Sequence, residues 1–228
     1  MNIKICVSIS PETVSEAMRL VEKAENHKAD FVEVRLDRLR NHNELPDIAD
    51  CSQVPMIAAN RSIKHQGKFL GSETERRQIL LNAAESGFKY VDVEIPALES
   101  DDFINKLRKM GANLILSFHD FTKTPSLPRM GKILEQEIAS GADICKIVTT
   151  AGSINDNLTV LNFVSRACKR AKMVCFAMGE LGKPSRILSP LFGALFAIAS
   201  LERGGETAQG QLTVQEMRDI YQTLGLVE

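Results

Sequence analysis

Residues 141–150 read Gly141-Ala-Asp-Ile-Cys-Lys146-Ile-Val-Thr-Thr150, and this stretch carries the pattern that decides the fold. Glycine is common just past the last residue of a helix, so Gly141 predicts the end of one. The segment 144–150 that follows is rich in Ile and Val and has the length of a buried strand. The stretch therefore predicts a helix that leads directly into a strand.

The same alternation recurs on both sides of this stretch. Strands are predicted over residues 3–8, 31–37, 54–61, 90–95, 113–120, 144–150, 172–179 and 194–200. Helix patterns lie between most of them, with starts predicted at Pro11 after Ser10 and at the capping-box pairs Ser72/Glu75 and Thr213/Glu216, and ends predicted at Gly87, Gly111 and Gly141. Strands that alternate with helix-length connections favour a parallel sheet with crossover helices.

Eight such units predict an α/β protein with a single (β/α)8 TIM barrel, formed as one domain by residues 1–228. A chain of this length allows one domain or two, and no linker rich in Pro, Gly or Ser divides it. The alternative architecture is a doubly wound open sheet. No G-x-G-x-x-G motif follows the first predicted strand, and this favours the barrel.

Composition and charge exclude several classes of protein. The 28 Lys and Arg residues balance 29 Asp and Glu residues, and a net charge of −1 lacks the basic signature of proteins that bind nucleic acid or an anionic membrane surface. The longest uncharged run, residues 187–201, is shorter than the ~18 residues of a membrane-spanning helix. Five cysteines without C-x-x-C spacing favour a reducing compartment and argue against a disulfide framework or a zinc site. We therefore expect a cytoplasmic protein.

Charged side chains interrupt several of the apolar strands, mostly toward their C-terminal ends. Side chains alternate between the two faces of a strand, so one face is expected to carry Glu33, Arg35 and Asp37 in one strand and Asp92 and Glu94 in another. An antiparallel sheet with one solvated face would give the same alternation. The helix-length connections favour a barrel instead, and in a barrel these charges would surround the mouth where such enzymes carry their active sites.

Lys146 and His119 are the two candidates for chemistry. Burial of Lys146 within an apolar strand would lower the pKa of its ammonium group and free a neutral amine, as Schiff-base formation with a ketone requires. The alternative is a lysine that extends its charged end to solvent. His119 lies within a predicted strand and is a natural proton shuttle, although a hydrogen-bonded core histidine would look the same.

Three arginines, Arg35, Arg61 and Arg186, lie at predicted strand or loop ends. Guanidinium groups bind carboxylates with paired hydrogen bonds, so this set points to an anionic small-molecule substrate. Surface salt bridges are the alternative interpretation for each of them. The Gly-bearing polar segments 62–71 and 203–211 are either flexible connections or loops that close over a ligand.

The ordered set of motifs resembles the type I 3-dehydroquinate dehydratases, collinearly from Ser8 to Leu212. The motifs are Glu33-Val-Arg35-Leu-Asp37, Arg61-Ser, Ser117-Phe-His119-Asp-Phe, Ala142-Asp-Ile-Cys-Lys146-Ile, Met178-Gly-x-x-Gly182-x-x-Ser185-Arg186 and Ala208-Gln-Gly-Gln211. The resemblance implies a homodimeric (β/α)8 lyase of the shikimate pathway, in chorismate and aromatic amino-acid biosynthesis. Such a lyase converts 3-dehydroquinate to 3-dehydroshikimate without a metal or a cofactor.

The resemblance also implies a role for individual residues. Lys146 matches the lysine that forms a Schiff base with the C3 ketone, and His119 matches the histidine that transfers protons. Positions that hold the substrate match Ser8, Glu33, Arg35 and Arg61 for its hydroxyls, Arg186 for its carboxylate, and Thr207 and Gln211 in a lid loop. The rival interpretations are a Schiff-base aldolase on the same fold and a non-catalytic barrel that binds a cyclic hydroxy acid.

One position departs from the family pattern. Many relatives carry a glutamate that partners the catalytic histidine where this chain has His65. A histidine supplies no fixed negative charge there, so either another acid orients His119 or its basicity is lower than in relatives. Glu94 is the first candidate for that acid.

Overall fold

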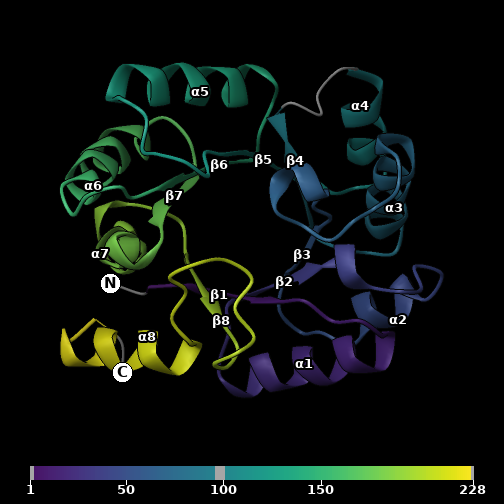
Figure 1. Ribbon diagram of the computed structural model, residues 1–228. Helices are drawn as coiled ribbons and strands as arrows, with labels where there is room; N and C mark the ends of the chain where they lie inside the picture. The colour runs from purple at the N-terminus through teal and green to yellow at the C-terminus, as the bar shows by residue number, and fades with distance from the viewer. Residues whose placement is uncertain (1–2, 96–100, 227–228) are drawn as a thin grey trace. The chain divides into compact units, whose positions relative to one another are not determined.

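The computed structural model describes residues 3–95 and 101–226, where strands and helices alternate along the chain (Figure 1). The strands are β1 (Ile5–Ile9), β2 (Phe31–Arg35), β3 (Met56–Ala59), β4 (Tyr90–Glu94), β5 (Asn113–His119), β6 (Ile144–Thr150), β7 (Met173–Met178) and β8 (Ala197–Ser200). The helices are α1 (Val14–Asn26), α2 (Leu45–Asp50), α3 (Glu73–Glu85), α4 (Asp101–Lys109), α5 (Leu127–Ala139), α6 (Asp156–Ala167), α7 (Lys183–Leu188) and α8 (Val214–Thr223).

The strands form one sheet in the order β7-β6-β5-β4-β3-β2-β1-β8. Neighbouring strands from β1 to β4 pair in parallel, as do β5, β6 and β7. This order, with a helix after each strand, is that of a (β/α)8 barrel. The predicted fold class is confirmed, and the alternative of an antiparallel sheet is wrong.

The chain divides into two compact units. The first, called here the N-terminal unit, holds residues 6–114, and the second, the C-terminal unit, holds residues 1–5 and 115–228. In both units the strands are almost fully buried, because one face packs on helices while the other also carries apolar side chains between its charges. Within the described residues, no helix is both long and apolar enough to cross a membrane.

Most of the predicted helix ends are confirmed. The Ser72/Glu75 and Thr213/Glu216 capping boxes precede α3 and α8, and each satisfies backbone N–H groups that the first helical turn leaves unpaired. Gly87, Gly111 and Gly141 follow α3, α4 and α5 with positive φ angles, a conformation that glycine adopts without steric cost.

The strands predicted over 54–61 and 194–200 are shorter than predicted, at Met56–Ala59 and Ala197–Ser200, and two further local predictions are wrong. Helix α1 begins at Val14 rather than at Pro11, because the Thr13 side chain, and not Ser10, accepts the capping hydrogen bond, from Glu16 N. The strand predicted over 31–37 ends at Arg35, and Leu36–Arg38 form a short 3-10 helix. That turn brings the Asp37 carboxylate back onto the side chain of Arg35.

Candidate active site

The first group of candidate residues lies in the N-terminal unit, on one face of strands β1 to β4. Ser8 and Glu33 are register partners on β1 and β2, and the Ser8 hydroxyl donates a 2.8 Å hydrogen bond to Glu33 Oε1. Both side chains are buried. This hydrogen bond orients the Glu33 carboxylate toward β1.

The Asp37 carboxylate forms hydrogen bonds to both of the candidate residues Arg35 and Arg61. Arg35 donates to both of its carboxylate oxygens, from Nε at 2.8 Å and from Nη2 at 3.0 Å. The same oxygens accept the backbone N–H groups of Arg61, at 3.4 Å, and of Lys68, at 2.9 Å. A side chain at Gly67 would meet the Arg61 carbonyl oxygen at 1.9 Å, so this glycine lets the loop close against Arg61.

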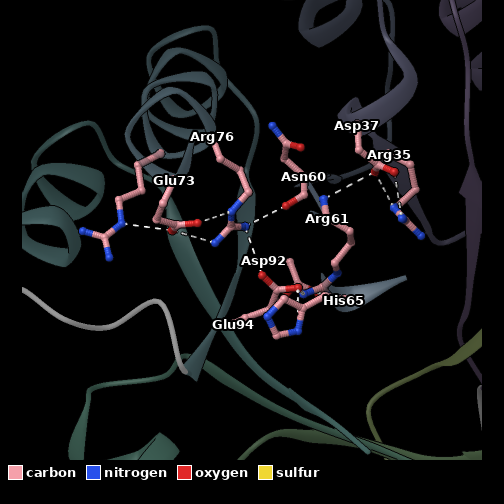
Figure 2. Close-up of polar contacts among 10 residues, drawn as sticks. Arg35, Asp37, Asn60, Arg61, His65, Glu73, Arg76, Asp92 and Glu94 are labelled. Atoms are coloured by element: carbon pink, nitrogen blue, oxygen red, sulfur yellow. Dashed lines mark hydrogen bonds and ion pairs between the residues drawn. The ribbon is translucent and has the colours of Figure 1, made fainter. Parts of the chain in front are cut away.

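Arg61 itself lies in a buried cluster of charges (Figure 2). Its Nη2 is 2.6 Å from Asp92 Oδ2 and its Nη1 is 2.9 Å from Glu94 Oε1. Burial alone would lower the pKa of Arg61, but Asp92, Glu94 and Glu33 outweigh it and hold that pKa above its ordinary value. The guanidinium therefore stays charged and can bind hydroxyl or anionic groups of a ligand.

His65 and Glu94, the two residues predicted as possible support for catalysis, are near each other. His65 Nδ1 lies 3.7 Å from Glu94 Oε1, and the imidazole is partly exposed. The second carboxylate oxygen of Glu94 is 3.0 Å from Arg76 Nη1. Glu94 thus has an arginine at each oxygen, and its assignment as the partner of His119 stays a prediction.

We expect Asp37→Asn to lower the free energy of unfolding by about 2 kcal/mol, because a buried carboxylate that accepts from Arg35 and two backbone N–H groups becomes a neutral amide. Chemical denaturation measures the loss. Asp47→Asn, at an exposed position of α2, is the matched control and should change stability by less than about 0.5 kcal/mol. Equal losses in the two variants would contradict the role assigned to Asp37.

The second group of candidates lies in the C-terminal unit. Lys146 on β6 is paired in register with Ser117 on β5, and Val148 is paired with His119. Lys146 and His119 therefore share one face of two adjacent strands, one pleat repeat apart, which is about 7 Å along the strand. Lys146 is 4% exposed and His119 is half-buried, with its ring stacked on Phe121. An amine and an imidazole so placed can act on one bound molecule.

Arg186 is brought to the same face. Phe176 on β7 is the register partner of Val148, and the Arg186 guanidinium lies 4.2 Å from the centre of its ring. Arg186 follows Ser185 in α7, and the Ser185 hydroxyl accepts from Ala177 N at 3.0 Å. This bond ties the start of α7 to the end of β7 and so fixes where Arg186 emerges.

The surroundings of the Arg186 guanidinium suit the binding of an anion. The residue is completely buried, and its Nε has no hydrogen-bond partner within the part of the chain that the structure describes. Nη2 donates to Gln209 O at 3.1 Å. Burial lowers the pKa of Arg186 to about 9, and no acidic side chain among the described residues offsets this effect. An incoming carboxylate would restore the lost solvation of this guanidinium.

The predicted lid residues Thr207 and Gln211 contact each other. Gln211 Oε1 accepts from the backbone N–H groups of Thr207, at 2.7 Å, and Ala208, at 3.2 Å, while Nε2 donates to Thr207 Oγ1 at 3.2 Å. A side chain at Gly210 would meet Gly179 O at 2.3 Å, so this glycine lets the loop approach the chain just after β7. The loop is thus fastened beside the turn that leads to α7.

Three features of the site were missed from the sequence. They are the bridging role of Asp37, the ring of Phe176 under Arg186, and the reach of Arg76 to Glu94. Arg76 lies on the buried face of α3 with Leu80 and Ala83. An arginine that shares the helical spacing of these apolar residues was the signal in the sequence that could have identified it. Among the described residues, no cluster of three or more His, Cys, Asp or Glu side chains is arranged to hold a metal ion.

Comparisons with protein families, with related sequences and with solved structures all point to the same family. The type I 3-dehydroquinase family matches residues 5–228. A 3-dehydroquinate dehydratase of Dehalococcoides mccartyi is 37% identical over 220 residues, which cover 96% of this chain and 95% of that protein. The crystal structure of 3-dehydroquinate dehydratase from Geobacillus kaustophilus shares the fold, with a TM-score of 0.89 at 24% identity over 98% of this chain and 92% of that one. The structure of the Enterococcus faecalis 3-dehydroquinate dehydratase gives a TM-score of 0.83 at 27% identity, over 97% and 94% of the two chains. The chain belongs to the type I 3-dehydroquinase family.

Proposed function

We propose that this protein dehydrates 3-dehydroquinate to 3-dehydroshikimate through a Schiff base at Lys146. The observation that carries the proposal is the placement of a buried lysine and a histidine on one face of adjacent strands, where a ketone bound to the first lies within reach of the second. Membership of the type I 3-dehydroquinase family supports the same reaction. An amine is the nucleophile that Schiff-base formation with a ketone requires.

The proposed reaction has two halves. The Lys146 amine attacks the C3 carbonyl carbon, the carbonyl oxygen takes one proton from the amine and one from solvent and leaves as water, and a cationic iminium remains. His119 then takes the proton from C2, and the electrons of that C–H bond form an enamine with the nitrogen. The enamine expels the C1 hydroxyl, which takes the proton back from His119 and leaves as water. Hydrolysis of the iminium releases 3-dehydroshikimate and regenerates the amine of Lys146.

The remaining site residues are proposed to bind the substrate. Arg186 would pair with its carboxylate, since this buried guanidinium has unsatisfied hydrogen-bonding capacity. Hydroxyl groups of the substrate would be held by Ser8, Glu33, Arg35 and Arg61, and the loop contacts would come from Thr207 and Gln211. We further propose that both units of the chain fold as one catalytic domain.

Conversion of 3-dehydroquinate by the purified protein tests the proposed function. Loss of water creates a double bond conjugated with the carboxylate and the ketone, so product formation is followed by ultraviolet absorption and confirmed by proton NMR. We expect conversion without an added cofactor, at a rate unchanged after dialysis against a metal chelator. No conversion by a folded protein would contradict the proposal.

Arg186→Met tests the carboxylate site through stability. Since burial holds the pKa of Arg186 below its ordinary value, the charged form costs folding free energy at neutral pH. Its partner Gln209 O also accepts from Gly179 N, so the variant leaves that carbonyl paired. We expect the thermal midpoint to rise by about 3 °C, for a gain of about 1 kcal/mol.

The same variant should lose the stabilisation that wild type gains from 3-dehydroshikimate, because the product carries the carboxylate. Thermal unfolding with and without the product measures both effects. Arg170→Met, which removes an exposed pair with Glu135, is the control and should change neither. A lower midpoint for Arg186→Met, or unchanged stabilisation by the product, would count against the assignment.

We also propose that the protein is a cytoplasmic homodimer. The odd number of cysteines and the biosynthetic role of the family support the compartment. Sedimentation velocity decides the oligomeric state: a species of twice the 25.2 kDa chain mass is expected, and a single monomer-sized species would overturn the proposal.

A further inference from the structure

We infer that Arg76, on helix α3, is a positioning residue that holds the Arg61 guanidinium in place for substrate, through Glu94 and the backbone of Asn60. The inference rests on the proposed function, because Arg61 is there assigned to substrate binding. Figure 2 shows the Arg76 guanidinium between Glu73, on its own helix, and Glu94, at the end of strand β4.

Arg76 contacts the surroundings of Arg61 by two routes. Its Nη1 lies 3.0 Å from Glu94 Oε2, and the other oxygen of that carboxylate is 2.9 Å from Arg61 Nη1. The same Nη1 donates a 2.7 Å hydrogen bond to the backbone oxygen of Asn60, the residue directly before Arg61. Arg76 thereby fixes both the carboxylate that holds the Arg61 side chain and the backbone from which that side chain extends.

The rest of the Arg76 guanidinium is also engaged. Nε and Nη2 each donate a 2.8 Å hydrogen bond to the Glu73 carboxylate. This bidentate pair fixes the plane of the guanidinium. The direction of the remaining nitrogen, Nη1, is thereby fixed as well. The Glu73 side chain is 45% exposed, whereas Arg76 and Glu94 are both buried, so solvent screens the Arg76–Glu94 pair weakly. The geometry is that of a rigid bridge between the helix and the charged cluster.

Arg76 affects Arg61 because both arginines contact the same carboxylate, that of Glu94. With Arg76 present, each oxygen of Glu94 faces its own guanidinium, and Arg61 takes one of them. Without Arg76, the carboxylate can rotate and offer both oxygens to Arg61. Arg61 would then be drawn toward Glu94, with fewer N–H groups left to meet a substrate hydroxyl. Arg76 therefore acts on the substrate through Arg61 and not by contact.

A double-mutant cycle tests this route. Arg76→Met is expected to raise the KM for 3-dehydroquinate about tenfold and to change kcat by less than about twofold, because it weakens binding common to the substrate and the transition state. In an Arg61→Met background, adding Arg76→Met should change KM by less than about twofold, since the route through Arg61 is already gone. An equal effect in both backgrounds would overturn the inference.

Two further variants separate positioning from a purely structural role. Arg77→Met removes the neighbouring arginine of α3, which pairs with Glu73 and lies over the Phe103 ring, and should leave KM unchanged. Arg76→Lys keeps the positive charge without the planar fork, so it should recover thermal stability and only part of the substrate affinity. Full recovery of KM by lysine, or an equal rise of KM in Arg77→Met, would contradict the positioning role.

A crystal structure of Arg76→Met gives a readout that needs no turnover. We expect the Arg61 guanidinium to move toward Glu94 and to contact both of its carboxylate oxygens, where wild type has only the Nη1 contact with Oε1. An unchanged Arg61 would overturn the inference. If wild type fails to turn over 3-dehydroquinate, the proposed function is wrong, while the position of Arg61 still decides whether Arg76 holds it.

Discussion

Lys146→Met is expected to lower turnover of 3-dehydroquinate by a factor of about 10⁴ or more, because it removes the nucleophile on which both halves of the reaction depend. Methionine has a similar volume and no amine, so the apolar packing of β6 is kept. Lys146 is 4% exposed, and replacement of a buried lysine by an apolar side chain of similar volume should leave the protein folded. Steady-state turnover and circular dichroism measure the two properties.

The controls for Lys146→Met separate loss of chemistry from loss of structure. Lys132→Met, at an exposed position of α5, removes one lysine outside the site and should keep full activity. Binding of 3-dehydroshikimate to Lys146→Met should persist, since Arg186 remains to hold the carboxylate. Turnover within about tenfold of wild type would show that the reaction proceeds without the imine, and the mechanism would be wrong.

His119→Gln is expected to slow dehydration by about 10²- to 10⁴-fold, the usual contribution of a general acid–base group. Because His119 is assigned to the C2 proton and the leaving hydroxyl, and not to the carbonyl, the variant should still form the imine at Lys146. The adduct that sodium borohydride traps during turnover should therefore accumulate rather than disappear. Single-turnover kinetics and intact-protein mass spectrometry follow both quantities.

His27→Gln is the matched control for His119→Gln, because His27 caps the C-terminus of α1 outside the site. It should leave turnover unchanged. Substrate deuterated at C2 adds a sharper test, since a primary isotope effect is expected where abstraction of that proton limits the rate. A His119→Gln variant with wild-type turnover would remove His119 from the proton-transfer role.

The fold could be predicted from the sequence because each strand–helix unit carries its own local signals. Strand β6 has the predicted bounds, Ile144–Thr150, since a short run rich in Ile, Val and Thr after a helix-ending glycine favours a strand. The end of β2 could not be predicted in the same way. The 3-10 turn at Leu36–Arg38 depends on contacts of Asp37 with Arg61 and Lys68, which are remote in sequence.

The positions of the candidate residues were predictable where a charge interrupts an apolar strand, as at Lys146, Glu33 and Glu94, which all lie buried on their strands. Alternation within a strand sorts such residues by face without knowledge of their partners. Arg76 could not be assigned in this way. An arginine in a helix is ordinarily solvated, and its role depends on a carboxylate that lies on another element. Local patterns therefore identify the groups at the site, while the contacts that orient them require the structure.

Borohydride trapping at Lys146 tests the central claim most directly. The wild-type protein is incubated with 3-dehydroquinate and sodium borohydride, which reduces an iminium to a stable secondary amine. The protein is then digested, and the modified peptide is sequenced by mass spectrometry. We predict a single adduct on Lys146, in the peptide that contains residues 144–150, and none in Lys146→Met. An active protein that yields no adduct, or an adduct on a different lysine, would contradict the mechanism.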